Sequence, residues 1–265
     1  MTTAAKPAWK IASWNVNSLK VRLGHVQDWL AEHQPDVLCL QETKQTDQDF
    51  PVDAIRECGY QAHYSGQKTY NGVATLSRNE ARLLATALPD YDDPQKRLLA
   101  VEVDGVCVLN LYVPNGSETG SEKYAYKLDW LARLDDYTER LMQEHTNLIL
   151  TGDFNIAPAD ADVHDPEEWR DKILCSEPER AALNKLMDKG MQDTFRLFDQ
   201  DPNTFSWWDY RAAGFRRNRG LRIDLILASK LLAGRCRMAF IDKAPRTLER
   251  PSDHTPVAAV FEVGS

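Results

Sequence analysis

The chain has 265 residues, of which 43% are hydrophobic and 27% charged, as in ordinary globular proteins and unlike disordered chains. No run approaches the roughly 18 apolar residues of a transmembrane helix, and Met1–Ala8 lacks the apolar segment of a secretory signal, so we expect a cytoplasmic protein without membrane association. The formal net charge of −8 argues against nucleic-acid binding unless the basic residues are concentrated on one face.

Short apolar runs bounded by turn residues predict β-strands along the whole chain. In chain order they are Trp9–Val16, Asp36–Glu42, Gly72–Ser77, Leu98–Val103, Val106–Val113, Asn147–Thr151, Leu221–Ala228 and Val257–Val263. The dipeptide Asp104-Gly105 accepts the two positive φ angles of a tight turn, so the fourth and fifth strands are expected to form an antiparallel hairpin.

Apolar residues at helical spacing predict helices between these strands. Their expected ranges are Leu19–His33, Lys123–Glu144 and Pro178–Lys189. The alternation of helices and strands predicts an α/β fold, and the hairpin excludes an all-parallel sheet.

No linker or low-complexity tract divides the chain. We therefore expect one domain over residues 1–265, with residues 1–8 as a flexible N-terminus. The five cysteines are scattered and include no CxxC pair, so they are interpreted as reduced core thiols without zinc or disulfides. The strand-end segments Trp14–Asn17 and Gly152–Asn155 suggest an internal duplication, although two such matches also arise by chance.

Carboxylates and amides fall at the ends of otherwise apolar strands. Glu42 ends one run, Asp153 and Asn155 end another, and Asp224 lies inside a third. Buried charges need partners or a metal, and oxygen ligands of this kind suit a hard cation such as Mg²⁺. Each acid alone could instead cap a turn or pair with an arginine, but the combination predicts a magnesium site for phosphoryl transfer.

Two further positions are candidates for catalysis. Asp253 and His254 are adjacent, and neighbouring side chains on extended backbone diverge, so the acid can face a metal while the imidazole faces a phosphate. A lone histidine is more often a structural residue, and the flanking acids favour the functional interpretation. Tyr112 precedes Val113-Pro114, where a sharp turn would expose its hydroxyl, although most aromatic residues at strand ends pack in the core.

Arginine and aromatic residues alternate in Thr204–Arg222. Arginines can hold phosphates while aromatic rings stack on bases, so this stretch predicts a local nucleic-acid-binding face on an acidic protein. Strand alternation requires one of Trp207 and Trp208 to pack inward, and we expect Trp208 to face the nucleic acid. Lys68 and Tyr70 are candidates for a second contact loop.

Eight motifs occur in an order and spacing that resemble one protein family. They are Trp14–Asn17, Leu40–Glu42, Asn71–Val73, Tyr112–Asn115, Gly152–Asn155, Trp207–Arg211, Arg222–Asp224 and Ser252–His254. Together they closely resemble the exonuclease III family of abasic-site endonucleases, within the endonuclease/exonuclease/phosphatase superfamily. The resemblance extends from Trp9 to Val263.

This resemblance implies a four-layered α/β sandwich, with two mixed β-sheets packed face to face and helices outside. It implies a hydrolase that depends on Mg²⁺, with Mn²⁺ expected to substitute. Such an enzyme would act in base excision repair as a monomer on double-stranded DNA, cutting 5′ to abasic sites, trimming 3′ ends as a 3′–5′ exonuclease, or both.

The resemblance also implies roles for individual residues. Glu42 would be the principal metal ligand, and the remaining metal-site residues would be Asn15, Asp153, Asn155 and Asp253. Asp153 would activate the attacking water, Asn155 would orient it, and Asp224 would orient His254, which would hold the phosphate together with Tyr112. The DNA contacts are expected from Lys68, Tyr70, Asn71, Asn115, Trp208, Arg211, Arg216, Arg217 and Arg222.

Two other classes of protein share part of this pattern, and the chain departs from the family pattern at two positions. The superfamily includes inositol-phosphate phosphatases, which have little use for the aromatic residues of Thr204–Arg222, and a DNA-binding module with a decayed site would lack the carboxylates. Asn17 stands where some relatives carry aspartate, so we do not count it as a ligand. Leu221 stands where some relatives place a tryptophan beside the abasic sugar, so the pocket can differ in shape. The sequence does not indicate whether the acidic segment Ala159–Asp171 approaches DNA or solvent.

Overall fold

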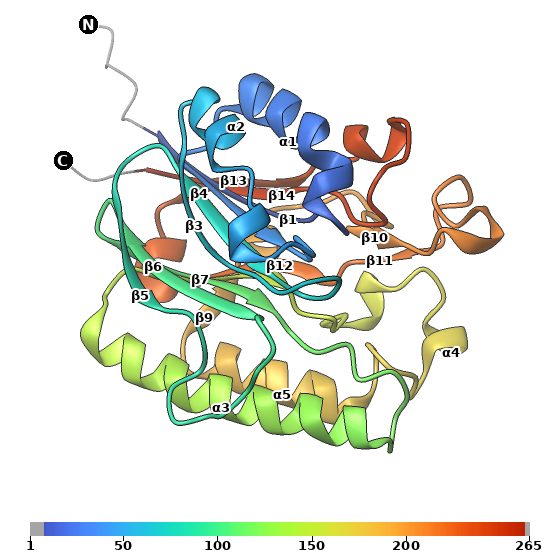
Figure 1. Ribbon diagram of the computed structural model, residues 1–265. Coiled ribbons are helices and arrows are strands. Elements are labelled where there is room, and N and C mark those ends of the chain that lie inside the picture. Colours follow the sequence, from blue (N-terminus) through green and yellow to red (C-terminus); the bar gives the residue numbers. More distant parts are fainter. Residues whose placement is uncertain (1–7, 263–265) are drawn as a thin grey trace, which may run out of the picture.

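The computed structural model describes residues 8–262, which form two six-stranded mixed β-sheets packed face to face, with helices on both outer faces (Figure 1). The predicted four-layered α/β sandwich is confirmed. Residues 1–7, most of the segment expected to be a flexible N-terminus, lie outside the described range, whereas Ala8 already belongs to the first strand. Among the described residues, no helix is long and apolar enough to cross a bilayer.

The first sheet has the strand order β13-β14-β1-β2-β4-β3. These strands are β1 (Ala8–Asn15), β2 (Val37–Gln41), β3 (Gln61–Ser65), β4 (Val73–Ser77), β13 (Cys236–Ile241) and β14 (Val257–Glu262). Helix α1 (Leu19–His33) connects β1 to the parallel strand β2 and covers the outer face together with α2 (Val52–Glu57).

The second sheet has the order β5-β6-β7-β8-β12-β9. Its strands are β5 (Ala81–Ala85), β6 (Leu98–Val103), β7 (Val106–Tyr112), β8 (Leu148–Asp153), β9 (Met191–Asp193) and β12 (Asp224–Ser229). Helix α3 (Glu122–Glu144) connects β7 to the parallel strand β8, and α5 (Glu177–Asp188) lies beside it on the outer face (Figure 1).

Three shorter elements complete the part of the fold that bears on function. They are α4 (Pro166–Trp169), α6 (Lys230–Ala233) and a two-stranded ribbon of β10 (Trp207–Trp208) and β11 (Gly220–Leu221). The loop carried by this ribbon extends away from the sandwich at the right of Figure 1.

The two sheets share one pattern of strand directions. In each, a parallel pair joined by a helix lies at the centre, and the flanking neighbours run antiparallel. Parallel strands end at the same edge of their sheet, so β1 with β2, and β7 with β8, each bring two chain segments together there. This arrangement positions the strand-end acids.

The layer between the sheets is apolar at its centre and polar toward that edge. Ile11, Val108 and Ile226 are among the residues of its apolar part. Closer to the strand ends, the amide of Gln41 donates to Ser13 Oγ at 2.9 Å and to Asn110 Oδ1 at 2.7 Å, which links the two sheets. These hydrogen bonds satisfy polar groups that burial would otherwise penalise.

The predicted hairpin is confirmed, since β6 and β7 pair antiparallel and both Asp104 and Gly105 have positive φ. The three predicted helices are also present. The strands that the pattern did not indicate include β3, β5 and β13, which lie at the sheet edges and pair on one side only. Their mixed exposure hides the apolar alternation that a buried strand displays.

Gly152 offers a direct test of the β7–β8 contact. A Cβ at this position, where φ is +143°, would lie 1.9 Å from the carbonyl oxygen of Leu111 on β7. Gly152→Ala must push the two central strands apart, and we expect it to lower the free energy of unfolding by about 1–3 kcal/mol in urea denaturation. Gly24→Ala is the control, because a Cβ there meets nothing within 4 Å and alanine favours the helix. An unchanged denaturation midpoint for Gly152→Ala would contradict the close approach.

Candidate active site

The predicted catalytic acids converge at the edge where the parallel strand pairs end. Asn15 is the last residue of β1, Glu42 follows β2, and Asp153 is the last residue of β8. Strand β12 runs antiparallel to β8, so its first residue, Asp224, pairs directly with Asp153. Topology therefore brings together acids that are as much as 182 positions apart in sequence, from Glu42 to Asp224.

Glu42 and Asp153 come from different sheets and share one amide donor. Asn15 Nδ2 donates to Glu42 Oε1 and to Asp153 Oδ2, in each case at 2.9 Å. Ligand atoms of Glu42, Asp153 and His254, which together we call the acid cluster, all lie within 4.8 Å of one another. Two carboxylates at this separation fit Mg²⁺, which proteins usually hold by one or two carboxylates together with water and substrate phosphate.

Lys44 is a neighbour that sequence reasoning missed. Its Nζ lies 2.9 Å from Glu42 Oε2 and also donates to Asn17 Oδ1. No local pattern indicated this contact, because Glu42 and Lys44 both have positive φ and do not follow the alternation of extended backbone. The lysine compensates part of the negative charge that Glu42 and Asp153 concentrate.

Asp153 and Asn155 form one tight turn. Asn155 has a φ of +50°, which lets its backbone N–H donate to Asp153 Oδ1 at 2.9 Å. The side-chain amide of Asn155 donates to Val113 O at 3.0 Å, and its oxygen accepts from Asn115 Nδ2 at 3.0 Å. Burial raises the pKa of Asp153 above its ordinary value, while His254 and Asn15 act in the opposite direction. The turn thus places an amide beside a carboxyl group that accepts protons more readily than usual.

His254 and Asp224 are in direct contact, as their predicted roles require. His254 Nδ1 lies 2.8 Å from Asp224 Oδ2, and His254 Nε2 lies 3.6 Å from Asp153 Oδ2. Burial alone would lower the pKa of His254, but Asp224 and then Asp153 outweigh it and raise that pKa to about 10. The imidazole is therefore cationic at neutral pH, with Nε2 as a donor at the acid cluster.

Tyr112 lies at the end of β7 in contact with Arg97, the second site residue that sequence reasoning missed. The guanidinium of Arg97 lies 4.6 Å from the centre of the tyrosine ring, and its Nη1 donates to Tyr112 O at 3.2 Å. Burial and the nearby acids Glu42 and Asp153 raise the pKa of Tyr112 well above its ordinary value, so its hydroxyl remains a hydrogen-bond donor.

Asp253 lies beside the acid cluster but is not one of its three members. Its Oδ1 accepts from Asn17 Nδ2 at 2.9 Å and its Oδ2 from Trp207 Nε1 at 3.1 Å. In this arrangement Asp253 holds strand β10 through Trp207. The contact of Asp253 with a metal stays a prediction. The same applies to Asn15, whose oxygen accepts from the Asn17 backbone N–H while its nitrogen faces the acids.

Three of the predicted DNA contacts line one hollow at the side of the cluster. Tyr70, Asn71 and Asn115 border it together with Arg97, and its volume is about 420 Å³. Tyr70 is 68% exposed, and Lys68 is exposed next to it. The hollow has both polar and apolar lining, and an exposed aromatic ring at its rim is suited to contact a ligand that is larger than a phosphate.

Arg211, Arg216 and Arg217 are exposed on the loop between β10 and β11. The ribbon itself is tied to the acid cluster, because Trp207 forms a β-bridge with His254 and Trp208 N donates to Asp253 O. The arginines thus belong to a ribbon that is held in place by the segment with Asp253 and His254.

The expectation that Trp208 faces the nucleic acid is wrong. Trp208 is fully buried, its Nε1 donates to Asn218 Oδ1 at 3.1 Å, and its ring packs edge-on against Phe215. The alternation of the two tryptophans is present, but with Trp207 as the partly exposed one. The pairing of Trp207 with Leu221 and its hydrogen bond to Asp253 set this register.

The expected DNA contact of Arg222 is also wrong. Its side chain is 1% exposed, with Nε 2.6 Å from Asp162 Oδ1 and Nη2 2.7 Å from Asp193 Oδ2. Two acids therefore hold this guanidinium inside the protein. This ion pair also shows where part of the acidic segment Ala159–Asp171 lies. Asp162 belongs to that segment and is buried in contact with Arg222.

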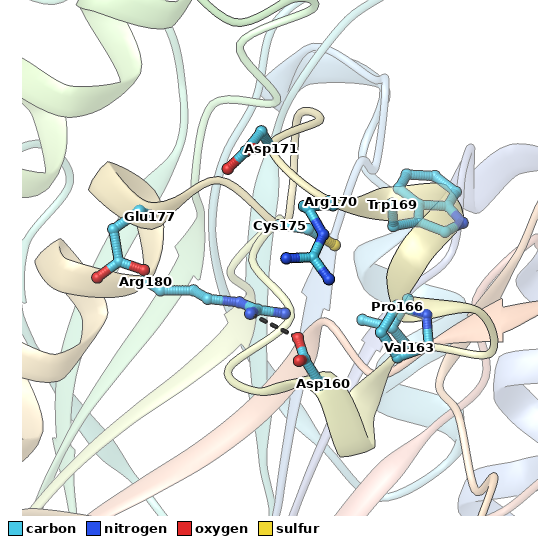
Figure 2. A pocket seen from close by; sticks show the side chains of 9 residues that line it. All are labelled: Asp160, Val163, Pro166, Trp169, Arg170, Asp171, Cys175, Glu177 and Arg180. Carbon is cyan, nitrogen blue, oxygen red and sulfur yellow. Dashed lines mark hydrogen bonds and ion pairs between the residues drawn. The ribbon is translucent and has the colours of Figure 1, made fainter.

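Six other residues of that segment, among them Asp160 and Trp169, border a separate cavity of about 170 Å³ (Figure 2). Asp160 from the segment pairs with Arg180 of α5 at 2.8 Å, Arg170 lies next to this pair, and Trp169 lies on the side away from α5. None of the lining residues belongs to the acid cluster. The segment thus packs between α5 and the ribbon, with several of its carboxylates exposed.

The raised pKa of His254 predicts how stability depends on pH. The folded state holds this proton more tightly than the unfolded chain, so the extra stability is fully present below the ordinary value of 6.5 and is lost as the pH rises to about 10. His254→Gln lacks this contribution. Urea unfolding across that range should show wild type losing stability relative to His254→Gln, and parallel pH curves would contradict the assignment.

Comparisons with known proteins find a matching family model and similar proteins of known structure. Residues 12–254 match the model of the Endonuclease/Exonuclease/phosphatase family. The chain is 37% identical to exodeoxyribonuclease III of Haemophilus influenzae, over 96% of this chain and 100% of that protein. A 3′ phosphatase from Neisseria, solved with product DNA hairpin, has 46% identity and a TM-score of 0.91, covering 96% and 100% of the two chains. An AP endonuclease from Archaeoglobus fulgidus has 39% identity and a TM-score of 0.92 at the same coverage.

Proposed function

Because the chain belongs to the endonuclease/exonuclease/phosphatase family, we propose that it is a Mg²⁺-dependent DNA-repair phosphodiesterase, which cuts 5′ to abasic sites, trims 3′ ends as a 3′–5′ exonuclease, or does both. The observation that carries the proposal is the hydrogen bonding of the acid cluster, in which Asn15 joins Glu42 to Asp153 and Asp224 pairs with His254. Phosphoryl transfer needs a positioned nucleophile and compensation of charge on the phosphate oxygens, and these groups supply both.

The proposed mechanism assigns one task to each residue. Glu42 and Asp153, with Asn15, Asn155 and Asp253 nearby, would hold Mg²⁺ or Mn²⁺, which would polarise the phosphate and compensate charge on the leaving oxygen. Asp153 accepts the proton of the attacking water, a role that suits a carboxyl group with a raised pKa. Asn155 orients that water from the adjacent turn.

Two donors act on the phosphate in this proposal. His254, kept cationic by Asp224, donates from Nε2 to a phosphate oxygen, and Tyr112 donates from its hydroxyl. Both groups keep their protons at neutral pH, so neither competes with Asp153 for the role of base. The division of labour follows from burial and from the charges around each group.

DNA is the proposed substrate because two contact surfaces flank the acid cluster. The exposed arginines of the β10–β11 loop lie on one side, and the hollow bordered by Tyr70, Asn71 and Asn115 lies on another. Trp207 replaces Trp208 as the aromatic contact in this proposal, and Lys68 adds a charge near Tyr70. We further propose that the enzyme acts as a monomer in the cytoplasm on double-stranded DNA.

The test compares three probes under the same Mg²⁺ concentration: a duplex with one abasic site, an intact duplex with a recessed 3′ end, and an inositol phosphate. Cleavage of the first or second probe supports the proposal, and their ratio measures the balance between incision at abasic sites and trimming of 3′ ends. Leu221 is fully buried in an apolar cluster with Val163 and Ile223, so its side chain does not line an open pocket. Hydrolysis of the inositol phosphate alone would place the chain in a different branch of the superfamily.

Glu42→Gln should abolish DNA cleavage at ordinary Mg²⁺ concentrations while leaving the fold intact. The amide oxygen can still accept from Asn15, but the charge that attracts the metal is lost. Partial rescue at high Mg²⁺ or with Mn²⁺ is expected. Glu102→Gln serves as the control, because Glu102 pairs with Arg82 on the β5–β6 edge. Full activity of Glu42→Gln at ordinary Mg²⁺ concentrations, without rescue by extra metal, would mean that the metal site lies elsewhere.

Replacing Arg211, Arg216 and Arg217 by glutamine should weaken DNA binding and flatten its salt dependence. The slope of log K against log salt should fall by about one unit for each phosphate that the variant no longer neutralises. The triple variant Arg56, Arg133 and Arg140 to glutamine removes the same charge from other parts of the surface. Equal slopes in the two triple variants would show that the loop makes no phosphate contact.

A further inference from the structure

A lysine lies fully buried behind the active-site turn. Lys127 points inward from α3, and its side chain has no exposed surface. Its Nζ donates to Asn155 O at 2.7 Å, to Asn115 O at 3.2 Å and to Glu179 Oε1. An ammonium group has three N–H donors, so each of them has a partner.

The partner of Lys127 is equally buried and equally occupied. Glu179 on α5 has no exposed surface, and its Oε1 also accepts from the backbone N–H of Leu174 at 3.1 Å. Its Oε2 accepts from Ser176 N at 3.1 Å and from Ser176 Oγ at 2.6 Å. The ion pair therefore connects α3 and α5 with the loops that follow β7 and β8.

Such a pair is an expensive way to join two helices. Moving both charges out of water carries a large desolvation cost, and well-packed apolar residues often stabilise a fold as much or more. The same helices already have a half-buried tie at their other end, where Lys189, just after α5, lies 3.0 Å from Asp135 and 2.7 Å from Glu139. Stability alone gives little reason for a second, buried lysine.

The contacts of Lys127 indicate what it does. Asn155 and Asn115 each offer it a backbone carbonyl, and their side chains are hydrogen-bonded to each other at 3.0 Å. Asn155 is in the left-handed region at a φ of +50°, which costs energy for a residue other than glycine. A cation beneath its carbonyl holds that conformation, in which the Asn155 N–H reaches Asp153 Oδ1.

We propose that Lys127, paired with Glu179, is a positioning residue that holds Asp153 and Asn155 in the geometry of the chemical step. This inference rests on the proposed function for its kinetic part, since Asp153 and Asn155 are there assigned to the attacking water. Lys127 touches neither substrate nor metal. It acts through the turn, so its loss affects turnover more than DNA binding.

The decisive variant is Lys127→Met/Glu179→Gln, which removes both charges and so leaves no unpaired ion in the core. Lys127→Met alone is measured beside it, and if that single variant fails to fold, the double variant decides. Lys189→Met is the matched control, because it removes a lysine that ties the same two helices away from the turn. Single-turnover rates and dissociation constants are measured on the abasic-site and recessed-3′-end duplexes.

We expect the folded double variant to lose about 10²-fold in single-turnover rate, as a displacement of about 1 Å at the reacting groups costs, with its dissociation constant for DNA unchanged. Lys189→Met should keep the wild-type rate. A double variant with the wild-type rate would overturn the proposal, and so would an equal loss in Lys189→Met.

Hydrogen exchange supplies a readout that does not depend on the substrate. The amide of Asn155 should lose protection in the double variant, while the amides of β8 up to Thr151 keep theirs. If wild type cuts none of the DNA probes, the proposed function fails, and exchange alone decides the positioning role. Unchanged protection of Asn155 would then overturn it.

Discussion

Glu42 and Asp153 belong to different sheets, and the amide of Asn15 holds their carboxylates together by two hydrogen bonds of 2.9 Å. Ligand atoms of the two carboxylates lie within 4.8 Å of each other, and like charges this close repel, so the arrangement needs compensation from its surroundings. Lys44 supplies it on the side of Glu42 and His254 on the side of Asp153. The rest of the site is built around this compensation, because the same groups that neutralise the acids also fix their orientation.

The fold makes this contact possible by using one arrangement of strands twice. Each sheet places a helix-linked parallel pair at its centre, so that four strand ends meet at one edge of the sandwich. The antiparallel neighbours β12 and β14 begin where those strands end, and they bring Asp224 and the loop of His254 to the same place. The shared pattern is consistent with the duplication that the two strand-end motifs suggested.

Sequence reasoning was most successful where burial imposes a regular pattern. The hairpin at Asp104-Gly105 and the helix Leu19–His33 follow from turn chemistry and from helical periodicity, both of which are local. The strand-end acids were recognisable because a charge is costly in an apolar run. Edge strands such as β13 were missed, since the exposed Arg237 and Met238 break its alternation.

The errors at the site come from contacts between distant segments. Whether Trp207 or Trp208 packs inward depends on the pairing with β11 and on Asp253, neither of which the local sequence indicates. A lysine within a charged helix is normally exposed, so nothing in the sequence distinguished Lys127. Arg222 resembled its neighbours in the arginine-rich stretch, and only Asp162 and Asp193 explain why it is buried.

The exposed arginine loop has a consequence for how the molecule meets its substrate. With 40 acidic and 32 basic residues, the protein as a whole is repelled by a polyanion, whereas the loop is attracted to it. The acidic body and the basic loop together give the molecule an electric dipole. The field of the polyanion therefore orients the molecule with the arginine loop foremost. Encounters in other orientations end in separation. An acidic body thus reduces unproductive adsorption along DNA, and the few arginines of the β10–β11 loop decide which face arrives first.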